Sequence, residues 1–169
     1  MEEFIRNMSD LKSKSCWSFY AGPSTGSHVD FDFGKKVPRA VPLLGNPTLT
    51  QNQRFYEGEM SLFVQCAWRL DSVDAVICGS TDSNEKGGAM LAGLQSVIGK
   101  TVEDVVIAEP SFDLTLRFRG DLSLKIFCDQ TNLEDDDPNY MLHTKDRIYV
   151  VGPRSRIRLE TPSRNPPRW

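Results

Sequence analysis

The residues of this chain that are best suited to binding or chemistry form a run of carboxylates. Four acids follow one another at positions 134–137, and a tyrosine stands three residues further on. With Asp129 these acids could ligate calcium or magnesium, but the glycine and terminal glutamate of an EF-hand loop are missing. Adjacent acids attract basic proteins, and tyrosine is a frequent anchor of protein interfaces. We therefore predict no metal site and a partner-binding site made of Glu134, Asp135, Asp136, Asp137 and Tyr140.

Catalytic arrangements are weaker. His143 could act as an acid or base, but no motif around a serine or cysteine indicates a nucleophile. Residues 21–27 superficially resemble a phosphate-binding loop, yet they lack its lysine and join two predicted strands. A surface or hydrogen-bonded histidine and a hairpin turn are the favoured interpretations. We expect no catalytic residue and no cofactor.

The cysteines predict a reducing environment. None belongs to a Cys-x-x-Cys pair, and most lie in apolar, strand-like runs. Small buried hydrophobic side chains are favoured over disulfides, zinc ligands or a catalytic thiol. They are Cys16, Cys66, Cys78 and Cys128. Because the first ten residues lack a signal sequence and no long apolar run occurs, we expect a cytoplasmic protein that does not enter a membrane.

Composition is that of an ordinary globular protein. The chain has 169 residues, of which 39% are hydrophobic and 25% are charged, and its formal net charge is −3. This length suits one domain or two small fused modules. The mild acidity argues against nucleic-acid binding, which usually needs a basic surface. Arginines from 154 onward make the C-terminal end basic, and a solvated tail is the simplest interpretation.

The chain also resembles itself at four places that keep the same order. Apolar residues fall on apolar residues, and one pair of segments shares three of six residues. The matched segments are 4–19 with 90–105, 29–34 with 114–120, 61–66 with 123–128, and 75–79 with 148–152. Four matches in one order favour a degenerate tandem duplication over chance.

Each half is predicted to contain one helix followed by four strands. Apolar residues at helical spacing indicate helices at 1–13 and 88–98, and apolar residues at every second position indicate half-buried antiparallel strands. The fold class is therefore α+β. We expect two helix-plus-four-stranded modules, at 1–80 and 81–160, that pack as a sandwich or curl into a barrel-like body, followed by a flexible Pro/Arg-rich tail at 161–169.

Function is expected where the halves differ, because loops tolerate change without cost to the core. The first half carries an insertion at 35–60, which is long for a hairpin connection. The second half carries the segment 129–146, which contains the acidic run.

A weak resemblance comes from ordered motifs at 87–152. They are Gly87-Gly88-x-Met90-Leu91-x-Gly93-Leu94, Ile98-Gly99-Lys100-Thr101-Val102, Leu114-Thr115-Leu116-x-Phe118, and Leu124-Lys125-Ile126-Phe127-Cys128-Asp129-Gln130. This pattern resembles small bacterial proteins of unknown function, similar in build to immunity proteins that neutralise secreted toxins. The resemblance implies a bacterial cytoplasmic protein that blocks a toxin by binding it, and it transfers no catalytic residue.

Three functions stay open on this basis. The first is a non-enzymatic protein-binding module whose partner is a basic protein such as a toxin. The second is a small-ligand-binding barrel, and the third is an enzyme of unrecognised type. A cavity with converging polar groups would favour a ligand, whereas a flat acidic face with an exposed Tyr140 would favour a protein partner.

Overall fold

Alternating apolar and polar residues form antiparallel strands throughout the computed structural model, which describes residues 1–162. Residues 163–169, and with them most of the predicted tail, lie outside the described part. The helices are α1 (Glu2–Ser9), α2 (Gln51–Phe55) and α3 (Ala89–Leu94), with short 3-10 turns η1 (Gln95–Val97) and η2 (Pro153–Ser155). The strands are β1 (Cys16–Tyr20), β2 (Val29–Pro38), β3 (Tyr56–Val64), β4 (Ala67–Asp71), β5 (Val76–Gly79), β6 (Val102–Ala108), β7 (Asp113–Phe118), β8 (Leu122–Phe127), β9 (Tyr140–His143), β10 (Ile148–Val151) and β11 (Ile157–Glu160).

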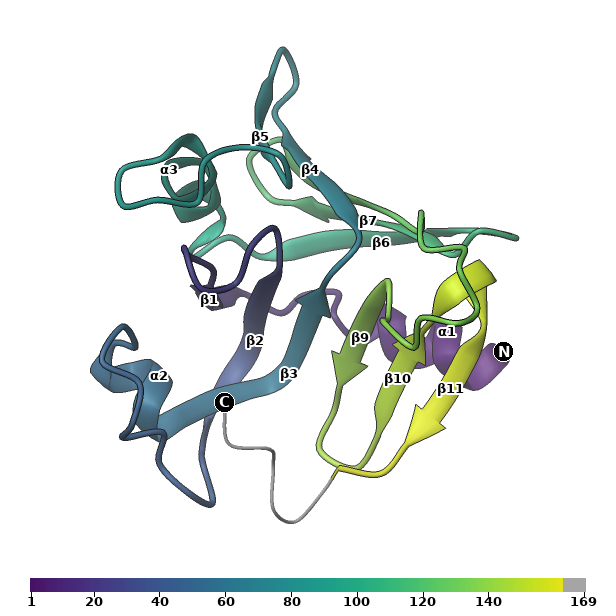
Figure 1. Ribbon diagram of the computed structural model, residues 1–169, viewed down its shortest axis with the longest axis horizontal. Helices are drawn as coiled ribbons and strands as arrows, with labels where there is room; N and C mark the ends of the chain where they lie inside the picture. The colour runs from purple at the N-terminus through teal and green to yellow at the C-terminus, as the bar shows by residue number, and fades with distance from the viewer. Residues whose placement is uncertain (163–169) are drawn as a thin grey trace.

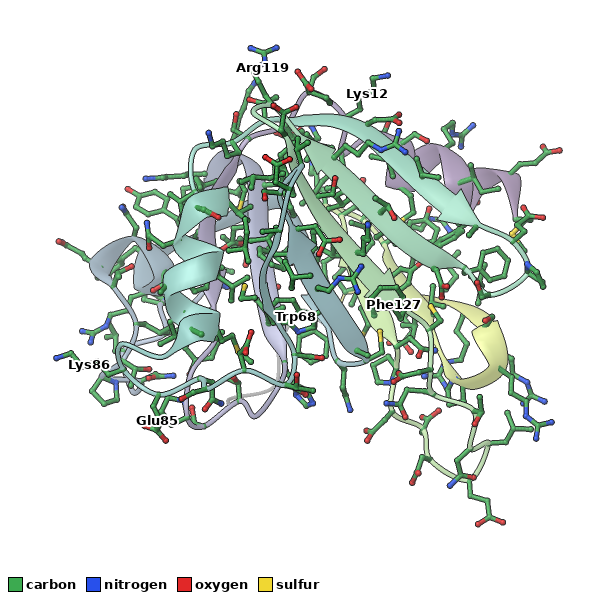
Figure 2. The ribbon with its side chains drawn as sticks, turned by 90° about the horizontal axis from the view of Figure 1, so that it is seen from above. Lys12, Trp68, Glu85, Lys86, Arg119 and Phe127 are labelled. Atoms are coloured by element: carbon green, nitrogen blue, oxygen red, sulfur yellow. The ribbon has the colours of Figure 1, made fainter. Side chains whose placement is uncertain are left out.

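The strands form two sheets that pack face to face (Figure 1). The six-stranded sheet has the order β1-β2-β3-β9-β10-β11, and the five-stranded sheet has the order β5-β4-β8-β7-β6. Figure 2 looks onto the five-stranded sheet and places Arg119 at the turn after β7 and Phe127 at the far end of β8. The predicted α+β class is confirmed, and the body is an open sandwich, not a closed barrel.

The sequence predicts two separate modules, but the two halves of the chain share both sheets. Each sheet contains strands from both halves, because β1-β2-β3 continue into β9-β10 and β6-β7-β8 continue into β4-β5. Each half also supplies five strands before β11, where four were predicted. The chain changes sheets between β3 and β4 over only Gln65 and Cys66. Sequence alternation shows which residues face the core, but it carries no information about which strands become neighbours.

The strand registers are nonetheless the same in the two halves. Phe33 lies opposite Cys16 and Met60, while Phe118 lies opposite Val102 and Leu122. Each first strand is irregular directly after its first residue, between Cys16 and Ser18 and between Val102 and Asp104. The two halves therefore use one pairing scheme.

The segments that lead into β1 and β6, the first strands of the two halves, pair with each other. Ser15 and Thr101 form an isolated bridge, and their hydroxyl oxygens lie 2.8 Å apart. On either side the backbone bonds are reciprocal. The amide of Cys16 donates to Lys100 at 2.9 Å, and the amide of Val102 donates to Lys14 at 2.9 Å. This crossing fixes the two sheets relative to each other through backbone bonds, which do not depend on side-chain identity.

Apolar side chains from both sheets fill the space between them. The apolar alternation predicts one buried face for each strand, and residues of this face are indeed buried, among them Val64, Cys66, Leu116, Phe118, Leu124 and Ile126. The rings of Phe33 and Phe118 stack with centroids 6.4 Å apart. Trp68 is also buried, and its indole N–H donates to the Ser27 carbonyl at 2.8 Å.

Helices α1 and α3 pack against β6 and β5, the two edge strands of the five-stranded sheet. Both predicted helices exist but are shorter, and α2 in the insertion was not predicted. Helix α1 buries Phe4 and Met8, and the ring of Phe4 meets Phe112 edge-on at 5.9 Å. Helix α3 packs on β5 at Gly93, where an added Cβ would lie 2.5 Å from the Cys78 sulfur. Only glycine permits this approach.

The Phe33–Phe118 stack allows a test of the core. Replacing Phe118 by alanine should lower the free energy of unfolding by about 3–5 kcal/mol, because a large buried ring leaves a cavity. Phe55, which is 40% exposed, provides the control, and its replacement by alanine should cost less than about 1 kcal/mol. Urea unfolding measures both. A small loss for Phe118→Ala would show that the ring does not join the two sheets.

Candidate protein-binding site

The predicted acidic residues lie in the long connection between β8 and β9. Glu134, Asp135, Asp136 and Asp137 are all exposed, as expected. We call residues 130–138 the acidic loop. In the first half, the equivalent connection between β3 and β4 consists of only two residues. The acidic loop is thus an addition to the shared pairing scheme and is not needed to build the sheets.

One buried residue fixes the end of the acidic loop. Asn139 has no exposed surface, and each of its polar groups has a partner. Its side-chain amide donates to Gly152 at 2.8 Å, and its side-chain oxygen accepts from the amide of Gln130 at 2.9 Å. Its backbone carbonyl accepts from Gln65 and Cys66. Nothing in the sequence around this asparagine indicated the role, because only the fold brings these four segments together.

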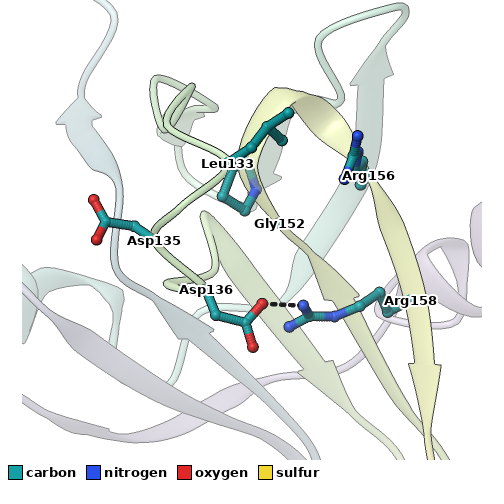
Figure 3. Close-up of a pocket in the computed structure, with 7 residues that line it drawn as sticks. Leu133, Asp135, Asp136, Gly152, Arg156 and Arg158 are labelled. Carbon is teal, nitrogen blue, oxygen red and sulfur yellow. Dashed lines mark hydrogen bonds and ion pairs between the residues drawn. The ribbon is translucent and has the colours of Figure 1, made fainter.

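Arginines from the end of the chain lie against the loop. Arg158 on β11 forms an ion pair with Asp136, and the amide of Arg154 donates to the Gln130 carbonyl at 2.9 Å. A small hollow of about 100 Å³ lies between the acidic loop and β11 (Figure 3). Its lining includes Leu133, Asp135 and Arg156. Two of the four acids, Asp135 and Asp136, therefore border a hollow that apolar and basic residues also line.

Tyr140 does not belong to the exposed site, and this prediction is wrong. The side chain is fully buried on the inner face of β9, where Tyr140 lies opposite Val64 of β3. Its hydroxyl donates to the Phe112 carbonyl at 2.9 Å. Burial raises the pKa of this phenol well above its ordinary value. The acidic loop ends before Tyr140, because Tyr140 and Leu142 belong to the alternating apolar pattern of strand β9.

The nucleophilic and basic side chains are in inert environments. All four cysteines are free, and burial raises the pKa of Cys16 and Cys66 to about 12 and that of Cys78 to about 11. A thiol with so high a pKa carries almost no thiolate at neutral pH. Burial lowers the pKa of His143, which is therefore neutral at pH 7. Within residues 1–162 no group of three His, Cys, Asp or Glu side chains is arranged to hold a metal ion.

The insertion at 35–60, which the sequence predicts to be a binding loop or a structured flap, forms a second polar region. It extends β2 and β3 as a ribbon and then folds back over the outer face of β1 and β2. Gln53 of α2 donates to the Ser18 hydroxyl at 3.1 Å and to the Phe19 carbonyl at 2.8 Å. The Gly58 amide donates to Asp32 at 2.7 Å. No residue of α2 is buried, so polar contacts hold the insertion in place.

Asp30 lies beneath this polar cover. One of its carboxylate oxygens is buried without a hydrogen-bond partner in the described chain. Burial, with a smaller contribution from the nearby Asp32, raises the pKa of Asp30 to about 7 against the opposing effect of Arg39. Burial also raises the pKa of Asp32. Asp30 therefore holds its proton at a pH where exposed aspartates are ionised.

Comparison with protein families, with curated proteins and with solved structures finds no match to this chain. In the described residues, none of the helices has the length and apolar character needed to cross a membrane.

The role of Asn139 can be tested by mutation. Replacing Asn139 by alanine leaves the backbone carbonyl bonds but removes both side-chain bonds at a fully buried position. We expect a loss of about 2–3 kcal/mol in unfolding free energy, because the partner amide and carbonyl are left unsatisfied. Hydrogen exchange at Gln130 should accelerate as well. Asn132→Ala, at an exposed loop position, is the control. Unchanged exchange at Gln130 would show that Asn139 does not fix the loop.

The protonation of Asp30 predicts a dependence of stability on pH. Because the folded state holds this proton more tightly than the unfolded chain, the contribution of Asp30 is complete below about pH 4 and is lost as pH rises to about 7. Replacing Asp30 by asparagine removes the ionisation. Relative to the unmodified chain, the variant should gain at least about 1 kcal/mol between about pH 4.5 and about pH 8.

Urea unfolding at several pH values measures this difference. Asp104→Asn, at a half-exposed carboxylate on the other sheet that pairs with Arg117, serves as the control and should show no such gain. A constant difference between Asp30→Asn and the unmodified chain across this pH range would mean that Asp30 is ionised throughout.

Proposed function

We propose that the protein is a non-enzymatic binding module of the bacterial cytoplasm whose acidic loop contacts a basic protein, such as a toxin that it neutralises. The observation that carries this proposal is the charge state of the loop. Four adjacent acids are exposed, and within the described residues only Asp136 takes part in an ion pair. Adjacent carboxylates repel one another, so an incoming cation lowers their energy.

The attachment of the acidic loop supports this role. A loop that is ordered before binding loses less entropy when a partner arrives. Asn139 and Arg154 hold the two ends of the loop through backbone and side-chain hydrogen bonds. Exposed Leu133 adds apolar surface beside the acids. A rigid patch of charge with an apolar side chain favours both fast encounter and a lasting contact.

The interior gives less support to the small-ligand alternative. Buried apolar side chains from both sheets form one continuous cluster between them. A barrel-like ligand site would need an open interior lined by converging polar groups. The acidic loop is the stronger candidate on this comparison.

The experiment isolates the partner and then removes the charge. The tagged protein and a variant with Glu134→Gln, Asp135→Asn, Asp136→Asn and Asp137→Asn are expressed in the native host. The variant should keep its melting temperature within about 2 °C, since exposed charges contribute little to stability. It should retain less of a co-purifying basic protein, and the coding sequence next to the gene is checked for a toxin.

Association kinetics with that purified partner provide the quantitative test. The unmodified chain should associate at least about tenfold faster than the variant at low salt, and the difference should shrink as the Debye length falls to about 8 Å near 0.15 M salt. A matched control neutralises four separated exposed acids, Asp74, Glu85, Glu109 and Asp121. Equal rates for the acidic-loop variant and the unmodified chain would exclude the loop from the contact surface.

We also infer that the two halves descend from one duplicated unit. The shared order of helix and strands, the matching registers and the reciprocal bonds at Ser15 and Thr101 support this inference. Cys66 and Cys128 follow β3 and β8, which hold equivalent places in the two sheets. An experimental structure in which no rotation brings β1–β5 onto β6–β10 would contradict it.

A further inference from the structure

The insertion at 35–60 forms an open groove. Helix α2 leads directly into β3, and the groove lies where these two elements meet the end of β2 (Figure 1). Its volume is about 610 Å³. Prolines and aromatic rings form its apolar part, and side-chain amides border them. The apolar residues are Pro38, Pro42, Phe55 and Tyr56, and the amides belong to Gln51 and Asn52.

The two aromatic rings of this groove are accessible. Phe55 is 40% exposed and Tyr56 is 37% exposed, and no residue of α2 is buried. Val41 and Leu44, in the same insertion, are exposed as well. Apolar side chains that gather on the surface in this way usually mark a contact surface.

Hydrogen bonds within the insertion fix the shape of the groove. The amide of Arg39 donates to the Phe55 carbonyl at 2.9 Å, and the amide of Leu43 donates to the Arg54 carbonyl at 3.0 Å. The Arg39 guanidinium donates to the Gln53 carbonyl at 3.0 Å. Because these bonds exist without a ligand, an occupant meets a preformed surface, and only the occupant loses conformational freedom on binding.

Aromatic grooves bordered by donors recognise proline-rich segments. A polyproline II helix has no internal hydrogen bonds, so its prolines can pack on aromatic rings while its carbonyls accept from side-chain amides. The chain itself contains such a segment. Beyond Pro162 the sequence continues as Ser-Arg-Asn-Pro-Pro-Arg-Trp, with adjacent prolines at 166 and 167 and a tryptophan at 169.

Strand β11 directs the chain toward the groove. The pairings of β10 and β9 place Glu160 of β11 at the same level as Ser61 of β3. All three pairings from β11 to β3 are antiparallel, so β11 and β3 run in opposite directions. The chain that leaves β11 is therefore headed for the end of β3 at which Tyr56 lies.

The length of the segment matches the distance to the groove. Three strand intervals of about 4.8 Å and five residues of β3 at about 3.3 Å separate Glu160 from Tyr56, which gives about 22 Å in a straight line. A polyproline II chain advances about 3.1 Å per residue. The two prolines can therefore reach about 19 and 22 Å from Glu160, and Trp169 can reach about 28 Å.

Charge does not select this occupant. The insertion contains four cations and two acids, and the segment beyond Pro162 adds arginines at 164 and 168. The affinity must therefore come from apolar contact of the prolines and the tryptophan with Phe55 and Tyr56. Contact of this kind does not weaken when salt screens the charges.

We infer that residues 163–169 dock in this groove of their own chain, with their prolines and tryptophan on Phe55 and Tyr56. The inference is independent of the acidic loop. A short linker provides an effective concentration on the order of 1 mM, so a dissociation constant of about 0.1 mM keeps about nine-tenths of the grooves occupied. A proline-rich segment of another protein enters only by displacing the chain's own.

Photo-cross-linking in the purified full chain tests this docking. A benzophenone amino acid replaces Asn52 in the groove or, as the reference position, Val73 in the turn between β4 and β5. An equal amount of isotopically labelled chain is mixed in, so that mass spectrometry separates cross-links within one chain from those between two. The probe at position 52 should form at least about tenfold more adduct with residues 163–169 of its own chain than the probe at position 73.

Variants of the segment identify the groups responsible. Pro166→Ala, Pro167→Ala and Trp169→Ala together should lower the adduct at position 52 at least about fivefold through lost apolar contact. The matched control, Arg164→Ser with Arg168→Ser, should retain it, and so should the unmodified segment in about 0.5 M salt. Both variants leave every residue of the described core unchanged. Phe55→Ser tests the groove side and should lower the adduct as well.

Three results would overturn the inference. Adducts mainly between labelled and unlabelled chains would identify a second copy as the occupant. Equal adducts at positions 52 and 73, or an adduct that survives the proline and tryptophan substitutions, would show that the segment does not bind in the groove. Loss of the adduct on arginine substitution or in salt would assign the contact to charge and exclude apolar docking.

Discussion

The fold depends on the contact between Phe33 and Phe118 and on the backbone crossing at Ser15 and Thr101 beside it. Both join the first half of the chain to the second at equivalent positions. Because each sheet takes strands from both halves, neither half can complete a sheet by itself. The hydrophobic free energy of the core is thus available only to the whole chain, which favours a single cooperative unit.

This arrangement explains how the chain can accommodate two additional segments without altering its sheets. The shared pairing scheme builds both sheets, and the insertion and the acidic loop are attached at the ends of their strands, between β2 and β3 and between β8 and β9. The acidic loop is fixed by buried Asn139, whereas the insertion is fixed by hydrogen bonds to Ser18, Phe19 and Asp32. Of the described residues in these two additions, Met60 alone belongs to the core cluster between the sheets, so most of each addition can change without a loss of core packing.

Sequence patterns predicted the strands well because alternation follows directly from burial on one face. The internal similarity also identified the right segments, including Cys66 and Cys128. It did not predict the exchange of strands, because apolar periodicity carries no information about neighbours. Tyr140 shows the same limit in the site: next to four acids it resembles an exposed anchor, but register places it opposite Val64 in the core. The exposure of Glu134–Asp137 was predictable because adjacent charges cannot be buried.

The most direct test of the binding account is site-specific photo-cross-linking in the native host. A benzophenone amino acid replaces Leu133 in the acidic loop or, as the reference position, Val73, which is 73% exposed in the turn between β4 and β5. The account predicts that the probe at position 133 yields a covalent adduct with one basic protein and that the probe at position 73 yields none. An adduct formed only at position 73, or the same adducts at both, would contradict it.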